Sequence, residues 1–298
     1  MLKSWVKNVL GTRLSRLLVR LVRGANLHEV HIVEAAFKSL GTVGVMIDVG
    51  AHHGSSLDGF AESGWTIYAF EPDPKNRAYL QSLVGRKSNV HIDTRGVSDV
   101  SQKDVAFFTS EVSTGISSLS SFHASHRETR RIDLITLSDF AVEQNIARVD
   151  FLKIDTEGFD IFVLRGFPWE RFTPQCVVCE YENRKTVPLG YDTANMCSFL
   201  TERGYEIAIS EWYPVVEYGG SVTWKAFRRS AAEIDPESWG NVIAYRPGTP
   251  LAKLLNRDAL AANYSEGLVL RRTDDLQPVP RPADKLAKRR TGGATAVS

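Results

Sequence analysis

An acidic residue, two glycines and two histidines follow an apolar run in the stretch DVGAHHG, residues 48–54. The run before Asp48 is typical of a buried parallel strand, and the glycines allow the backbone of the next turn to approach a ligand closely. The turn lacks the G-x-G-x-x-G spacing that holds a pyrophosphate, and an acid at the strand end suits a cationic ligand instead. We therefore expect Asp48, Gly50, His52 and Gly54 to belong to a cofactor site.

A second acid, Glu71, ends the next apolar run in YAFEPDP. It follows the glycine turn by about twenty residues, where Rossmann-type domains carry the acid that accepts hydrogen bonds from ribose hydroxyls. The alternative is a solvated carboxylate at a strand end, but the nearby glycine turn favours the ribose role. We include Asp99, after the third predicted strand, in the same cofactor set.

Three acids lie close together in the stretch DTEGFD, residues 155–160, directly after another strand-like run. Ligands of open parallel sheets bind beyond the carboxyl ends of the strands, so this position is suited to a reaction. Buried carboxylates are unfavourable unless they bind a cation, a hydroxyl group or a helix N-terminus. Capping accounts for one of these acids, which leaves Asp155 and Glu157 as catalytic candidates.

Four sequence blocks, in this order and spacing, resemble the FkbM-type methyltransferase family: IDVGAHHG, AFEPDP, ITLSDF and FLKIDTEGFD followed by VLRG. The resemblance covers about residues 43–185 and departs from the family pattern at His52, usually Asn, and at Asp160, usually Glu. It implies O-methylation of a sugar, glycolipid or secondary-metabolite hydroxyl, with S-adenosylmethionine (SAM) as methyl donor. The sulfonium and ammonium groups of SAM match the acid at Asp48.

Methyl transfer to oxygen requires a hydroxyl held about 3 Å from the methyl carbon and relieved of its proton. Asp155 and Glu180 end neighbouring predicted strands, where they could bind Mg²⁺ or another divalent cation against a diol. In the metal-free alternative, His53 or Asp155 is the general base and Glu157 orients the acceptor. The sequence leaves both mechanisms open.

Aromatic residues gather near the end of the predicted domain, at Trp212, Tyr213, Tyr218, Trp224 and Trp239. Aromatic faces of this kind stack on sugar rings, and they also fill the core at an interface. The sequence alone favours neither interpretation.

Apolar strand-like runs alternate with helix-like stretches from residue 43 onward, which predicts a parallel sheet with helices on both faces. The last two runs, YEIAISEWYPV and GNVIAYRP, lack a helix pattern between them and predict an antiparallel pair. We therefore expect an α/β Rossmann-like methyltransferase fold with a mostly parallel seven-stranded sheet and an antiparallel edge strand.

The chain divides into three predicted parts: an N-terminal basic amphipathic helical extension (1–40), the methyltransferase domain (41–250) and a C-terminal extension (251–298), largely disordered after about residue 272. The first extension carries leucines at helical spacing and no acid before Glu29. Peripheral contact with an anionic membrane through residues 1–25 is one interpretation. Packing on the catalytic domain or on a partner subunit in a homo-oligomer is the one we favour.

The overall charge is balanced, with 36 Lys plus Arg against 35 Asp plus Glu, which disfavours a nucleic-acid partner. Three cysteines, two of them in a C-x-x-C, do not form a disulfide framework, and the string PQCVVCEYE predicts a buried strand rather than a metal site. We expect a cytoplasmic protein, with the inner membrane face as the alternative. Two competing functions remain: a SAM-binding protein without methyl transfer, and an NAD-type oxidoreductase.

Overall fold

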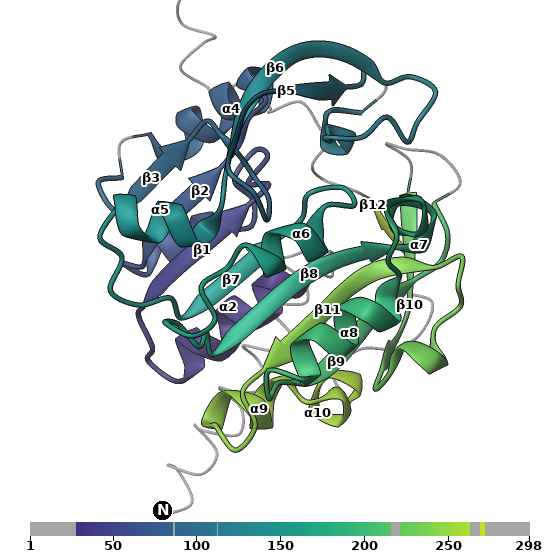
Figure 1. The fold of residues 1–298 in the computed structure, drawn as a ribbon. Helices are drawn as coiled ribbons and strands as arrows, with labels where there is room; N and C mark the ends of the chain where they lie inside the picture. Colours follow the sequence, from purple (N-terminus) through teal and green to yellow (C-terminus); the bar gives the residue numbers. More distant parts are fainter. Residues whose placement is uncertain (1–27, 86, 112, 216–220, 263–268, 272–298) are drawn as a thin grey trace, which may run out of the picture.

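The computed structural model describes residues 28–85, 87–111, 113–215, 221–262 and 269–271 (Figure 1). Within these residues a nine-stranded sheet has the order β12-β10-β9-β11-β8-β7-β1-β2-β3. The strands are β1 (Val45–Val49), β2 (Thr66–Phe70), β3 (Val90–Asp93), β7 (Phe151–Ile154), β8 (Cys176–Glu182), β9 (Glu206–Trp212), β10 (Ser221–Arg228), β11 (Trp239–Tyr245) and β12 (Val269–Arg271).

Five neighbouring strands, from β3 through β2, β1 and β7 to β8, pair in parallel. β11 is antiparallel to both of its neighbours, β8 and β9, and β10 and β12 continue the sheet in antiparallel pairing. The seven strands from β3 to β9 therefore form the expected mostly parallel sheet with an antiparallel edge region. The sequence did not predict that β11 would lie between β8 and β9, nor that β10 and β12 would extend the sheet.

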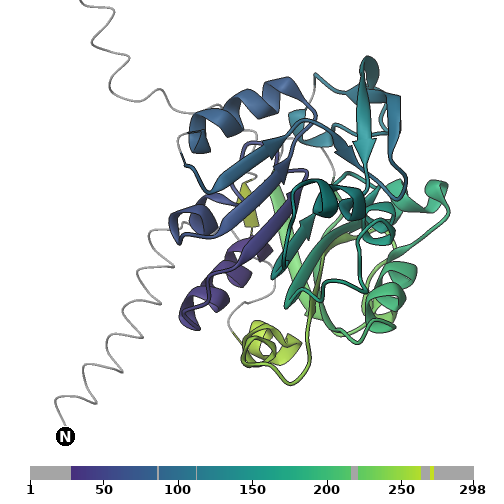
Figure 2. The ribbon, with the colours of Figure 1, turned by 60° about the vertical axis from the view of Figure 1, so that its left-hand side comes forward.

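Helices cover both faces of this sheet, and the strands bury side chains on each (Figures 1 and 2). Consecutive strand residues point to opposite faces, so Met46 belongs to one core cluster and Ile47 to the other. One face is covered by α2 (Glu29–Ser39), α3 (Asp58–Glu62), α4 (Pro74–Val84), α9 (Pro250–Leu255) and α10 (Arg257–Ala261). The other is covered by α5 (Leu137–Glu143), α6 (Asp160–Arg165) and α8 (Thr193–Thr201). The expected Rossmann-like α/β fold is confirmed.

A second, three-stranded sheet stands at the top of Figure 1 and consists of β4 (Gly96–Val97), β6 (Arg127–Ile135) and β5 (Gln102–Thr109). β5 and β6 are antiparallel, and the segment that joins them carries the short 3-10 helix η1 (Thr114–Ile116). This serine-rich segment contacts the loop after β7 of the large sheet: the Ser118 hydroxyl donates to the Glu157 carbonyl at 3.1 Å.

The N-terminal helix α2 is part of the core. Val33 and Phe37 are buried, and Phe37 makes edge contacts with Phe60 and Trp65. Residues 1–27, which carry the predicted basic face, and 272–298, predicted to be disordered, lie outside the described residues. None of the described helices has the length and apolarity needed to cross a membrane.

The three cysteines are buried thiols without disulfides, and Cys176 and Cys179 lie inside β8. Burial raises the pKa of the Cys176 thiol, which disfavours the reactive thiolate. Cys176 and Cys179 thus lie in the buried strand that the sequence predicted.

Candidate active site

A cavity of about 250 Å³ opens at the carboxyl ends of the parallel strands. Its walls include Gly50 and His52 after β1, Glu71 after β2, Asp155 and Glu157 after β7, and Glu180 in β8. Parallel strands all end at one edge of their sheet, so residues far apart in sequence meet there. Six of the predicted site residues are thus brought together around one cavity.

The turn after β1 is fixed by two left-handed residues. Gly50 has φ +76°, and a Cβ there would lie 1.9 Å from the Asp155 carbonyl oxygen. His52 has φ +48°, a conformation that Asn and His adopt more readily than most residues. His52 therefore differs from the Asn that is usual in the family, but it is also a residue type that this left-handed backbone tolerates.

Glu71 links that turn to the end of β2. Its carboxyl accepts the backbone N–H groups of His52 and Asp73, each at 2.8 Å. Burial raises the pKa of Glu71 to about 7, although the two N–H donors oppose the shift. The carboxyl lines the cavity at the strand end where a ribose-binding acid was expected.

Lys153 connects the turn after β1 to the end of β7. Its Nζ lies 3.1 Å from Asp48 Oδ1 and 3.6 Å from Asp155 Oδ2, and it donates to the Gly50 carbonyl at 2.6 Å. Burial disfavours the charged amine, but Asp48 and Asp155 outweigh that effect and raise the pKa of Lys153. Asp48 itself is fully buried and also accepts the Ser56 hydroxyl at 2.5 Å. Lys153 lines the cavity and Asp48 lies behind it.

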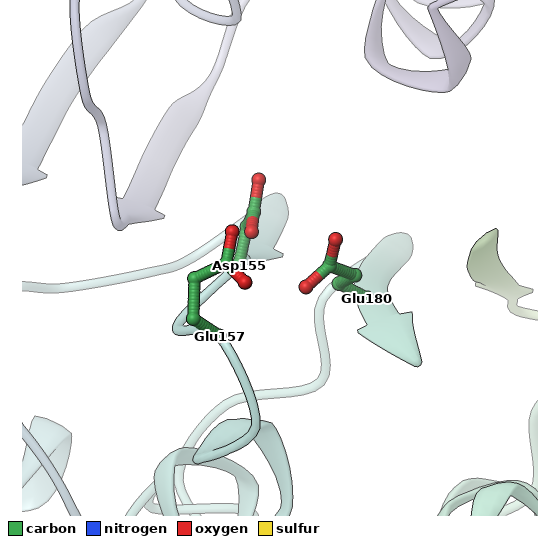
Figure 3. A group of neighbouring side chains, drawn as sticks. All are labelled: Asp155, Glu157 and Glu180. Atoms are coloured by element: carbon green, nitrogen blue, oxygen red, sulfur yellow. The ribbon is translucent and has the colours of Figure 1, made fainter. Parts of the chain in front are cut away.

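Three carboxylates face one another across the cavity: Asp155, Glu157 and Glu180 (Figure 3). One oxygen from each lies within 4.8 Å of the others. Asp155 and Glu180 are the pair predicted as metal ligands, and Glu157 joins them. The Asp155 side chain is 41% exposed, whereas Glu157 and Glu180 are buried, so Asp155 is the most accessible to an acceptor.

Lys185 neutralises part of this cluster from behind. It lies in α7 (Asn183–Thr186), and its Nζ forms ion pairs with Glu157, with Glu180 at 3.3 Å and with Glu182 at 2.8 Å. Burial raises the pKa of Glu180, and the negative charge of Glu157 raises it further. The positive charge of Lys185 opposes this shift but does not cancel it.

Asp160 has a positional role. Its Oδ2 accepts from the backbone and hydroxyl of Thr156, and its Oδ1 accepts the Glu180 N–H at 3.0 Å. These bonds tie the loop after β7 to β8, and burial raises the pKa of Asp160 to about 7. Asp160 lies in the first turn of α6, but its side chain does not cap that helix, so the expected capping role is replaced by these loop contacts.

Four predicted site residues lie outside the cavity lining: Asp48, which is described above, and His53, Gly54 and Asp99. His53 stacks on His52, with ring centroids 3.7 Å apart, and its ring is tilted by 53° against that of Tyr79 at 4.6 Å. Gly54 has φ +90° and packs toward Leu80 of α4. Asp99 accepts the Ser98 hydroxyl at 3.2 Å. A direct role for these residues stays a prediction, as does one for Asp48.

Sequence reasoning missed Lys153 and Lys185. Lys153 could have been noticed as the single charge within the apolar run FLKI, because a lysine buried in a central strand requires acidic partners. Lys185 gives no such signal, since its exposed-looking segment ENRKT is buried only by tertiary packing.

The comparison with protein families shows the family of this chain. A family model described as "Methyltransferase FkbM domain" matches residues 48–207, more than half of the chain. The chain belongs to the FkbM methyltransferase family. The matched residues start at Asp48 and contain the glycine turn, Glu71 and all three clustered carboxylates. This FkbM protein is a SAM-dependent methyltransferase, as the resemblance implied.

Solved structures resemble the FkbM protein only distantly. Precorrin-6y C5,15-methyltransferase from Geobacter metallireducens is 12% identical with a TM-score of 0.37, covering 75% of this chain and 90% of that chain. Magnesium protoporphyrin IX methyltransferase from Synechocystis, solved with bound SAM, is 14% identical with a TM-score of 0.36, covering 82% and 96%. At such values these likenesses carry no functional inference for this chain. A search of curated proteins finds no match.

Proposed function

We propose that this FkbM methyltransferase transfers the methyl group of SAM to a hydroxyl of a sugar, glycolipid or secondary metabolite. The observation that carries the proposal is the half-exposed Asp155 carboxylate, which lines the same cavity as Glu71. A carboxylate within reach of the acceptor oxygen is what O-methylation of a weakly acidic alcohol needs.

The residues of the cavity fit SAM, which supplies an electrophilic methyl group when bound. Glu71 is positioned to accept ribose hydroxyls, as acids at this strand end do. Acidic side chains in the cavity lining outnumber the two basic ones, Lys153 and Arg95, which favours a cationic ligand. These acidic side chains are those of Glu71, Asp155, Glu157 and Glu180.

For catalysis, we propose that an Asp155 Oδ atom accepts the proton of the acceptor hydroxyl. Lys153, 3.6 Å from Asp155, holds this carboxylate in position. Glu157 is held by Lys185 and orients the acceptor from the opposite side. His53, the other candidate base, stacks beneath His52 outside the cavity lining, which favours Asp155.

Between the two mechanisms left open by the sequence, we propose the metal-free one. Asp155, Glu157 and Glu180 offer the oxygen ligands that Mg²⁺ prefers. However, Lys185 already pairs with Glu157 and Glu180, and burial raises the pKa of Glu180, so part of the negative charge of this cluster is compensated without a metal. Turnover should therefore survive dialysis against EDTA, and Mg²⁺ should not stimulate it. Loss of activity in EDTA and recovery with Mg²⁺ would establish the metal-dependent mechanism instead.

The proposed function is tested in two stages. Calorimetry should detect binding of S-adenosylhomocysteine but not of NAD⁺, and Glu71→Gln should weaken that binding. Transfer of a labelled methyl group from SAM is then assayed against a panel of sugars, polyols and phenols. Asp155→Asn should lose methyl transfer while it retains S-adenosylhomocysteine binding, and Asp133→Asn, on the exposed face of β6, is the control. Full activity in Asp155→Asn would refute the assignment.

We make a separate proposal about what residues 1–27 contact. We propose that this basic segment packs on the catalytic domain or on a second copy of the chain, in a cytoplasmic protein. Deletion of residues 2–27 should then alter the mass measured by light scattering or the thermal stability. Sedimentation with anionic vesicles that disappears in the deletion variant would instead support the peripheral membrane contact.

A further inference from the structure

A segment of the second sheet forms one wall of the cavity. It lies between β5 and β6, and we call its residues 113–126 the strap. The strap residues in the cavity lining are Ser113, Gly115, Ser117, Ser118 and Leu119. On the large sheet, Glu71 and Asp155 line the same cavity after the ends of β2 and β7. A ligand that fills the cavity would therefore contact both sheets.

The strap has a defined fold of its own. Ser118 forms two backbone hydrogen bonds with Phe108 of β5, at 2.9 and 3.0 Å. The buried His126 donates from its Nε2–H group to the carbonyl of the fully buried Ile116, at 2.9 Å. These contacts join both ends of the strap and hold Ser117 and Ser118 at the cavity wall.

Ser118 contacts the loop after β7 at a strained residue. Its buried hydroxyl donates to the Glu157 carbonyl oxygen at 3.1 Å. Glu157 has φ +56°, a left-handed conformation that is uncommon for residues other than Gly, Asn and Asp, and Gly158 follows with φ +104°. Strained backbone of this kind persists only where the surrounding contacts hold it. The bond from Ser118 is one such contact, and it acts on the peptide unit between Glu157 and Gly158.

The strap also contacts the counter-ion of Glu157. The centroid of the Phe122 ring lies 5.3 Å from Lys185 Nζ, close enough for a cation–π contact. The same ammonium group forms an ion pair with the Glu157 carboxylate. The strap therefore acts on Glu157 directly through its backbone and indirectly through the partner of its side chain.

Ser117 links the strap to the cofactor side of the cavity. Its hydroxyl donates to Asp73 Oδ2 at 3.4 Å. Asp73 is buried, its backbone N–H donates to Glu71 Oε1 at 2.8 Å, and its carboxyl caps the start of α4. The strap is therefore hydrogen-bonded to the cofactor side of the cavity through Ser117 and to the carboxylate cluster through Ser118.

We propose that the strap couples cofactor binding to the position of Glu157, and that Ser118 is the positioning residue in this coupling. With a cofactor bound at Glu71, Ser117 holds the strap closed against the loop after β7. The closed strap keeps the Glu157 backbone left-handed and its carboxylate within the cluster. Because coupling is reciprocal, loosening the strap must also weaken cofactor binding. The inference rests on the proposed function only for the role of Glu157 toward the acceptor.

Hydrogen–deuterium exchange, followed by mass spectrometry on the full chain, tests this coupling. Saturating S-adenosylhomocysteine should slow the exchange of the strap amides roughly fivefold or more in the wild type. The Ser118 amide, which donates to the Phe108 carbonyl, reports strap opening. The exchange of residues 155–160, the loop that carries Glu157, should slow as well.

Ser118→Ala removes the hydroxyl, and Ser121→Ala, at an exposed strap position, is the matched control. Without ligand, residues 155–160 should exchange faster in Ser118→Ala and at the wild-type rate in the control. This measurement separates positioning from direct contact between Ser118 and the ligand. Affinity for S-adenosylhomocysteine, measured by calorimetry, should fall roughly fivefold or more in Ser118→Ala and stay within about twofold in the control.

Ser117→Ala provides a second test, which does not depend on the folding of Ser118→Ala. It breaks the contact with Asp73 and keeps the bond to the Glu157 carbonyl. In this variant residues 155–160 should exchange as in the wild type without ligand, whereas S-adenosylhomocysteine should protect the strap less. A residue that only stabilised the fold would change thermal unfolding but not this ligand-dependent protection.

Two results would overturn the inference. Equal exchange of the wild-type strap with and without saturating S-adenosylhomocysteine would refute the coupling. Equal exchange of residues 155–160 in unliganded Ser118→Ala and Ser121→Ala would refute the positioning role of Ser118. These measurements need no acceptor, so their outcome is separate from that of the methyl-transfer assays that test the proposed function.

Discussion

Gly50 lies against Asp155 so closely that a Cβ on Gly50 would be 1.9 Å from the Asp155 carbonyl oxygen. The turn after β1 and the loop after β7 therefore touch through their backbones. This contact sets the separation between the cofactor turn and the proposed catalytic carboxylate.

Gly50→Ala is expected to separate these two loops. Gly64→Ala is the matched control, because Gly64 also has positive φ, +84°, but a Cβ there would meet nothing within 4 Å. The control should lose about 1–2 kcal/mol for its left-handed backbone. Gly50→Ala should lose more, and its affinity for S-adenosylhomocysteine should fall at least tenfold. Urea unfolding and calorimetry measure the two effects, and equal losses in both variants would contradict the close contact.

His52 should tolerate Asn but not a β-branched residue. Its φ of +48° is accessible to Asn and strained for Val. His52→Asn should leave the free energy of unfolding within about 0.5 kcal/mol, and His52→Val should lower it by about 1–2 kcal/mol. Chemical denaturation of both variants provides the measurement. An equal loss of stability in the two variants would show that the imidazole, rather than the backbone conformation, matters at this position.

Glu71 should make the protein less stable as the pH rises. Its pKa is raised from 4.5 to about 7 in the folded state, so the folded state holds this proton more tightly than the unfolded state does. The free energy of unfolding should fall as the pH increases from about 4.5 to 7 and level off above 7. Asp160, also raised to about 7, acts in the same direction.

Glu71→Gln isolates that contribution. The glutamine cannot ionise, so the fall in stability between pH 4.5 and 7 should be smaller in the variant than in the wild type, whatever its stability at a single pH. Thermal unfolding across this range is the measurement. Parallel stability curves for the two proteins would mean that Glu71 is ionised normally.

Lys185→Met should be strongly destabilising. It removes the ammonium group that contacts Glu157, Glu180 and Glu182, and leaves buried carboxylates uncompensated. The expected loss is about 3–5 kcal/mol at neutral pH, and it should shrink in acid, where the carboxylates are protonated. Lys87→Met is the control, because its pair with Asp58 is partly exposed and should contribute no more than about 1 kcal/mol. A loss in Lys185→Met as small as in the control would rule out this role.

Local patterns were sufficient for the parallel half of the sheet. Apolar runs that end in Asp48, Glu71 and Asp155 predict strands whose carboxyl ends meet, and the meeting of Asp155 with Glu180 follows from that rule. The same patterns could not place β11, because a strand that pairs with β9 can lie along either of its two edges. They also could not assign the aromatic residues: Trp212, Trp224 and Trp239 are all buried in the core, and of these Trp212 and Trp239 also line the cavity, whereas Tyr213 is exposed. Tyr218 lies outside the described residues.

The sequence by itself determined the fold class, the family and the edge of the sheet where chemistry occurs, because strand periodicity, glycine turns and acids at strand ends are local features. Only the tertiary structure decided which charges compensate one another and what closes the cavity. Glu29 contacts Trp212 across 183 positions of sequence, and that contact depends on how α2 and the antiparallel strands bury their apolar faces together. Burial of this kind is summed over the whole core, so no single stretch of sequence contains it.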